Sequence, residues 1–103
     1  MTLDGTWRLE ADTPVGPAVS TLEVRVRDGR LEGTQTVLGA AVPIRDGRVT
    51  GDRLAWTIDL TQPFPMTLLL LATVAGDRLS GTGRGERTGS MPFTGVRTEG
   101  EVG

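Results

Sequence analysis

Apolar and polar residues alternate along most of the chain. Trp7, Leu9 and Ala11 alternate with charged residues, and the same pattern recurs at 22–27 and 54–60. A period of two places successive side chains on opposite faces of a strand. Because no helix-length stretch shows three-to-four spacing, the pattern predicts an all-β protein in which one face of each strand is apolar.

Turn signals separate the alternating runs. Asp28-Gly29, Asp46-Gly47 and Gly76-Asp77 are dipeptides typical of tight hairpin turns, and two wider, proline-containing loops are predicted at 13–18 and 62–65. The predicted strands span about 5–12, 19–27, 30–38, 41–45, 53–61, 66–75, 78–86 and 91–98, with 48–50 as a short additional strand.

A meander of this kind favours an up-and-down antiparallel barrel of about eight strands, because closure removes both exposed sheet edges. The connections are short, and no long crossover indicates a Greek key. A two-sheet β-sandwich is the alternative. With 103 residues, the chain is predicted to form a single β-barrel domain over residues 1–103.

The composition excludes much of the usual catalytic chemistry. The chain has no cysteine and no histidine, and all 11 basic residues are arginine. It therefore cannot build a Ser-His-Asp or Cys-His nucleophile, a histidine or thiolate zinc site, a disulfide or a lysine Schiff base. We expect neither a cofactor nor a metal site.

Charge and hydropathy bear on partners and location. The net charge is −2, and the arginines are scattered among acidic residues, so nucleic acid is not an expected partner. The longest apolar run, 68–72, is too short to span a bilayer, so no membrane partner is expected. The first residues show no signal-peptide pattern, which predicts a cytoplasmic protein. Arginine in place of every lysine is typical of GC-rich bacterial genomes.

Three short segments carry a family resemblance. Asp-Gly-Thr-Trp stands at 4–7, Leu-Glu-Gly-Thr at 31–34 and Pro-Phe-Thr-Gly-Val-Arg at 92–97. They resemble the calycin-type barrels, the lipocalins and avidins. The resemblance implies a barrel with Trp7 at one end and Arg97 packed over it. The chain is much shorter than lipocalins and lacks most of the avidin pocket, so neither ligand class carries over.

The alternation of the last strand predicts the same arrangement. Arg97 falls on the face of Phe93 and can lie over the Trp7 indole as a cation–π contact, forming a lid at one end of the barrel. The alternative is that Trp7 is an ordinary core residue and Arg97 an exposed terminal arginine. Parity places most carboxylates on the outer faces or in turns. Asp12 and Asp59, near strand ends, are the carboxylates that would enter a cavity at a barrel mouth if any does.

The inward faces carry residues that leave space or need a partner. Gly81, Gly83 and Gly85 share one face, which indicates either a cavity beside the strand or a bend needed for closure. Gln35 also faces inward, and a buried amide must be bonded to backbone or offered to a ligand. The predicted ligand-binding residues are Gln35, Leu54, Trp56, Leu68, Leu70, Met91 and Phe93.

These residues predict an apolar chamber that binds a small, largely apolar organic molecule. Two other functions remain open. One is a cofactor-free cyclase or isomerase that acts by confining its substrate away from water. The closing segment Thr-Gly-Val-Arg at 94–97 resembles small barrel cyclases of bacterial natural-product pathways. The other is a structural or interaction domain whose core is filled by side chains.

Strand 66–75 is apolar on both faces. Leu69 and Leu71 fall on its outer face, where they would form an exposed apolar patch. We expect a homodimer through these leucines, with burial beneath the loop at 13–18 as the alternative.

Overall fold

The computed structural model describes residues 3–13, 16–37, 39–61, 65–85 and 89–98. Within these ranges the chain forms strands and short turns, and no helix is present that could cross a membrane. The strands are β1 (Gly5–Thr13), β2 (Gly16–Arg27), β3 (Arg30–Val37), β4 (Ala40–Pro43), β5 (Arg45–Thr50), β6 (Arg53–Leu60), β7 (Met66–Ala75), β8 (Arg78–Gly85) and β9 (Gly89–Arg97). The predicted loops at 13–18 and 62–65 lie partly outside the described residues.

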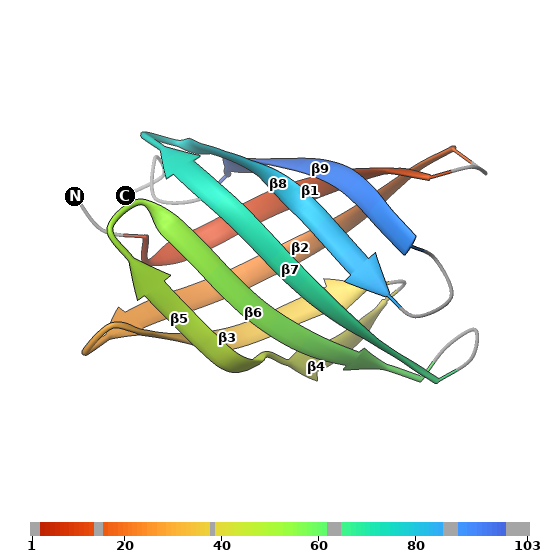
Figure 1. The fold of residues 1–103 in the computed structure, drawn as a ribbon, viewed down its shortest axis with the longest axis horizontal. Coiled ribbons are helices and arrows are strands. Elements are labelled where there is room, and N and C mark those ends of the chain that lie inside the picture. The colour runs from red at the N-terminus through yellow and green to blue at the C-terminus, as the bar shows by residue number, and fades with distance from the viewer. Residues whose placement is uncertain (1–2, 14–15, 38, 62–64, 86–88, 99–103) are drawn as a thin grey trace.

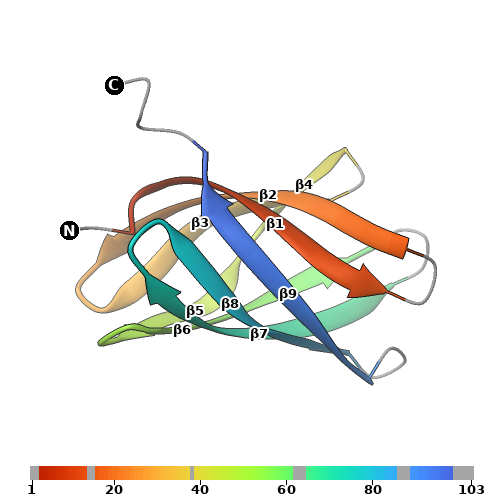
Figure 2. The ribbon, with the colours of Figure 1, turned by 90° about the horizontal axis from the view of Figure 1, so that it is seen from above.

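The strands form one closed antiparallel barrel (Figures 1 and 2). β1 pairs with both β2 and β9, and the β2–β3 pairing completes a ring of eight strands: β1, β2, β3, β5, β6, β7, β8 and β9. β4 is an extra strand that pairs with the second half of β3. The predicted all-β barrel is confirmed, and the two-sheet sandwich is not the architecture.

One predicted turn is instead a bulge. Asp46-Gly47 lies inside β5, where the register with β6 shifts between Arg45 and Arg48. Asp46 has a φ of 55°, and a Cβ on Gly47 would lie 2.1 Å from the carbonyl oxygen of Leu31. An Asp-Gly pair suits a bulge as well as a turn, because both require a positive φ and close backbone approach. The hairpin turn between β5 and β6 is formed by residues 51–52 instead.

The core is built from the inward residue of each alternating pair. Trp7, Trp56, Leu22 and Ile58 are the largest fully buried side chains. Burial of one such side chain contributes about 1.5–3 kcal/mol, so these positions hold the strands together around a common interior. Gln35 is the buried polar residue among the described positions.

The barrel has two ends, which we name the lid end and the mouth end. The lid end, on the left in Figure 1, holds the start of β1, the end of β9 and the turns at 28–29, 51–52 and 76–77. The mouth end, on the right, is where β1, β6 and β8 finish and β2, β7 and β9 begin. The two ends differ in the polar groups that the described residues place over the core.

Candidate functional site

Protein groups close the lid end. Trp7 is fully buried, and its Nε1 donates a hydrogen bond of 3.1 Å to the carbonyl oxygen of Leu3. The Arg97 Cζ lies 4.6 Å from the centroid of the Trp7 ring. Arg97 also donates from Nε to Oδ1 of Asp77 at 2.9 Å and from Nη1 to the carbonyl oxygen of Asp4 at 2.6 Å. The structure thus brings together the two residues predicted as a lid.

At the mouth end, the described residues place no comparable polar group over the core. The inward side chains of this end are largely apolar, half-buried and packed at the edge of the core. These half-buried positions are Ala11, Val37, Leu60, Met66, Leu68 and Met91. Of the predicted ligand-binding residues, Leu68 and Met91 lie here, whereas Leu70 lies deeper and is buried.

A short chain of hydrogen bonds lies beneath the mouth. Trp56 Nε1 donates to Oε1 of Gln35 at 3.0 Å, and Gln35 Nε2 donates to Oγ of Ser20 at 3.1 Å. The ring of Phe93 meets Trp56 edge-on, with centroids 6.1 Å apart. The Gln35 amide is therefore bonded to side chains, a solution that our prediction of backbone or ligand partners did not include.

Ser20 is the site residue that sequence reasoning missed. It occupies the inward face of β2, two residues before Leu22, and pairs across the sheet with Leu9 and Val37. The period-two pattern of β2, extended back by one step from Leu22, contained the signal. A serine on an inward face next to a buried glutamine is the partner to look for.

Cross-strand pairing links several of the predicted residues. Trp56 pairs with Leu70, Leu70 with Gly83 and Gly83 with Met91, so one inward row crosses β6, β7, β8 and β9. Leu54, by contrast, lies one inward position closer to the lid end and pairs with Ala72. The structure thus separates Leu54 from the residues around the mouth.

The glycines of β8 divide between the two predicted explanations. A Cβ on Gly81 would lie 1.8 Å from the carbonyl oxygen of Leu71, so this glycine permits the close approach of β7 that closure requires. A Cβ on Gly83 would meet only Leu70, at 3.9 Å, which is ordinary van der Waals contact. Gly81 therefore serves the close approach of the two strands, whereas Gly83 leaves space for a methyl group beside Leu70.

The two candidate carboxylates do not point into the barrel. Asp12 is exposed at the rim of the mouth end. Asp59 is exposed on the outer face of β6, where it accepts hydrogen bonds from Arg45 Nε at 2.6 Å and from Thr67 Oγ1 at 2.8 Å. The hydrogen bond from Arg45, followed by that from Thr67, lowers the pKa of Asp59 to about 2. Asp59 is thus an ionised, outward-facing group and not an acid or base of a chamber.

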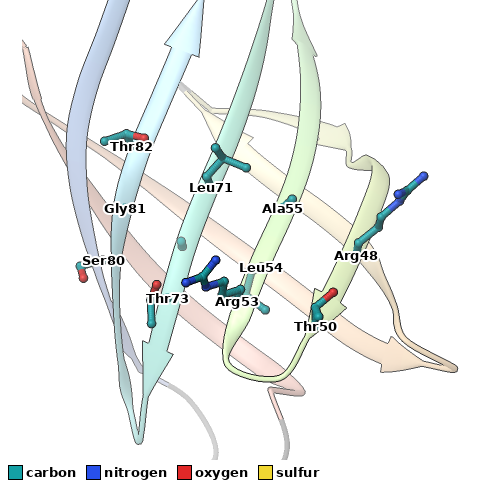
Figure 3. A pocket seen from close by; sticks show the side chains of 11 residues that line it. Arg48, Thr50, Arg53, Leu54, Ala55, Leu71, Thr73, Ser80, Gly81 and Thr82 are labelled. Carbon is teal, nitrogen blue, oxygen red and sulfur yellow. The ribbon is translucent and has the colours of Figure 1, made fainter.

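Two depressions are open to solvent. One, of about 410 Å³, lies at the rim of the mouth end and includes Ala11, Asp12 and Phe93. The other, of about 590 Å³, is a groove on the outer face of β5, β6, β7 and β8. Figure 3 shows Arg53 extending toward Thr73 within this groove. Leu54 is the predicted ligand-binding residue that lines it.

Metal binding has no support in the part of the chain that the structure describes. No group of three or more Asp or Glu residues gathers there in a way that could hold a metal ion. The candidate site is therefore an apolar mouth with one polar chain, Trp56, Gln35 and Ser20, beneath it.

Comparisons with known proteins address the fold. No protein-family model matches the sequence, and no curated protein matches it. The redesigned beta barrel b11L5F_LGL is 16% identical with a TM-score of 0.71, over 94% of this chain and 92% of that chain. The redesigned beta barrel mFAP1, solved bound to DFHBI, is 13% identical with a TM-score of 0.68. The match covers 93% of this chain and 94% of that chain. The chain thus has the fold of a small, closed, eight-stranded antiparallel β-barrel.

Proposed function

We propose that the protein binds a small, largely apolar organic molecule in the mouth end of its barrel. The observation that carries this proposal is the room beside the buried Gly83, where an added Cβ meets only Leu70. The half-buried Leu68 and Met91 lie between this room and solvent. Apolar walls with a few convergent polar groups are the general form of a small-molecule site.

The contrast between the two ends supports this location. At the lid end, Arg97 covers the Trp7 indole and bonds to Asp77 and to the backbone of Asp4. No comparable polar cover lies over the mouth among the described residues. The similar barrel mFAP1, bound to DFHBI, supports the idea that a barrel of this size accommodates a small organic ligand. Membership of the calycin-type barrels, with Trp7 and Arg97 as their lid, belongs to the same proposal.

Binding of DFHBI and of a panel of apolar metabolites, followed by tryptophan quenching and thermal shift, tests the proposal. The Gly83→Leu variant fills the room beside Leu70, and we expect it to lower affinity at least tenfold. Thr82→Leu places a leucine on the outer face of the same strand and is the matched control. Circular dichroism of both variants checks that the fold is retained, and Gly83→Ala supplies a milder filling.

The variants also separate the mouth from the outer groove, because Thr82 lines that groove. Loss of binding in Thr82→Leu but not in Gly83→Leu would place the ligand in the groove and overturn the proposed location. If no compound of the panel quenches tryptophan fluorescence or stabilises the wild-type protein, the binding function itself is wrong.

The other two functions are less well supported. The described residues around the mouth include no inward-facing acid or base, so a cyclase or isomerase there would act by confinement alone. No observation favours such an enzyme over a binding protein. For a structural domain with a filled core, the space for a methyl group at Gly83 is the observation that speaks against it.

The homodimer is a separate part of the proposal. Leu69 is 41% exposed and Leu71 48% exposed on the outer face of β7, which supports their burial by a second copy of the chain. Their exposure does not support the alternative that the loop at 13–18 covers them. A cytoplasmic location, and the lack of nucleic-acid and membrane partners, stay predictions.

A further inference from the structure

The hydrogen-bond chain beneath the mouth has only one possible direction. An indole N–H donates and cannot accept, so the group of Gln35 that faces Trp56 at 3.0 Å must be the amide oxygen. The amide nitrogen of Gln35 then faces Ser20 and donates to its Oγ at 3.1 Å. The chemistry of the indole alone fixes this assignment.

The chain leaves one polar hydrogen without a partner. Ser20 Oγ accepts from Gln35, but within the described residues nothing accepts the hydroxyl hydrogen of Ser20. Ser20 is half-buried on the inward face of β2. A ligand that covers Ser20 must accept a hydrogen bond from its hydroxyl or leave that hydroxyl unsatisfied.

The surroundings restrict the kind of acceptor. Ser20 pairs across the sheet with Leu9 and Val37, and the inward residues of the mouth are largely apolar. No arginine among the described residues of the mouth faces inward to neutralise an anion. A carboxylate would therefore enter as an unpaired charge, which is costly, whereas a neutral carbonyl oxygen needs only one donor.

We propose that the mouth selects neutral molecules that carry a carbonyl oxygen on an apolar skeleton, and that Ser20 donates the hydrogen bond which recognises it. Gln35 and Trp56 are positioning residues, because they hold Ser20 Oγ as an acceptor and so direct its hydrogen away from the core. The proposal rests on the proposed function and adds the ligand class. Leaving a buried donor unsatisfied lowers affinity by about tenfold or more.

The test compares two probes of similar shape, 2-acetylnaphthalene and 2-ethylnaphthalene, of which only the first carries a carbonyl oxygen. We expect the wild-type protein to bind the ketone at least tenfold more tightly, relative to the partition of each probe from water into hydrocarbon. In Ser20→Ala this preference should disappear, and in Ser20→Thr, which keeps the hydroxyl, it should persist. Ser80→Ala, on the outer face of β8, is the matched control.

Infrared spectroscopy measures the hydrogen bond to the ligand directly, and a change in protein stability does not alter the carbonyl frequency. The carbonyl stretch of the bound ketone should shift to lower frequency in the wild-type protein and lose that shift in Ser20→Ala. If wild type binds both probes with equal preference, or if Ser20→Ala keeps the infrared shift, the inference is wrong while the binding function stands. If neither probe binds the wild-type protein, the proposed function and the inference fail together.

Discussion

At the scale of single residues, two positions on the same face of a strand can have different surroundings. Gly81 and Gly83 lie on the same strand and the same face, two residues apart. The backbone of Leu71 excludes a side chain at Gly81, whereas Gly83 has only Leu70 near it. The alternation of the sequence identifies both as inward, but only the distance between β7 and β8 distinguishes a bend from open room.

This difference yields a matched pair of variants. Gly81→Ala should lower the free energy of unfolding by about 1–3 kcal/mol, because its methyl group collides with backbone that cannot move aside freely. Gly83→Ala should change it by less than about 1 kcal/mol, with a gain expected from the less flexible unfolded chain. Urea unfolding followed by circular dichroism measures both. Equal losses in the two variants would contradict the assignment of the room to Gly83.

The lid end gives a second prediction for a single residue. Arg97→Gln removes the guanidinium from the face of Trp7 together with the hydrogen bonds to Asp77 and Asp4. We expect a loss of about 1–2 kcal/mol in unfolding free energy. Arg97→Lys keeps the charge but not the planar fork, so its loss should be similar and not close to zero. A wild-type Tm in Arg97→Gln would show that the lid does not contribute to stability.

At the scale of elements, outer-face polar groups link neighbouring strands. Arg45 of β5 and Thr67 of β7 both bond to Asp59 of β6, next to the bulge at 46–47. The sequence predicted a turn at this bulge, because an Asp-Gly pair is compatible with either structure. A bulge forms because β5 pairs with β6 on both sides of Asp46 and Gly47 and pairs with β3 as well. The local sequence pattern does not show which strands pair with one another.

These bonds predict a pH dependence. Since the pKa of Asp59 is lowered from 3.8 to about 2 on folding, its contribution to stability is present above pH 4 and is lost as the pH falls toward 2. The wild-type Tm should exceed that of Asp59→Asn above pH 4, and the difference should shrink as the pH falls and vanish below pH 2. Asp12→Asn, a rim carboxylate outside any ion pair of the described residues, is the control. A Tm difference that is constant between pH 2 and pH 6 would contradict this role.

At the scale of the whole molecule, closure leaves no unpaired edge in the eight-stranded ring, but it does not cover the outer leucines of β7. Leu69 and Leu71 are exposed there, whereas Trp7 and Trp56 are fully buried inside. Strand β7 therefore has one apolar face in the core and a second apolar face that is exposed. The fold of a single chain accounts for the inward face but not for the apolar outer face.

Sedimentation measures the consequence. We expect the wild-type protein to be a dimer at tens of micromolar and Leu71→Glu to be a monomer, because burying a glutamate in an apolar interface is unfavourable. Val19→Glu is the control, since Val19 is comparably exposed but lies on β2. A wild-type monomer across the micromolar range would eliminate the dimer.

Sequence alone determined the fold class and the inward residues, because alternation is a local property of extended backbone with a period of two. On that basis Gln35, Trp56 and Phe93 were assigned to the interior, and the structure brings these three together. Only the tertiary structure decided that Ser20 completes their polar chain and that the lid end is closed. These features depend on distances between strands far apart in sequence, which register and barrel curvature set.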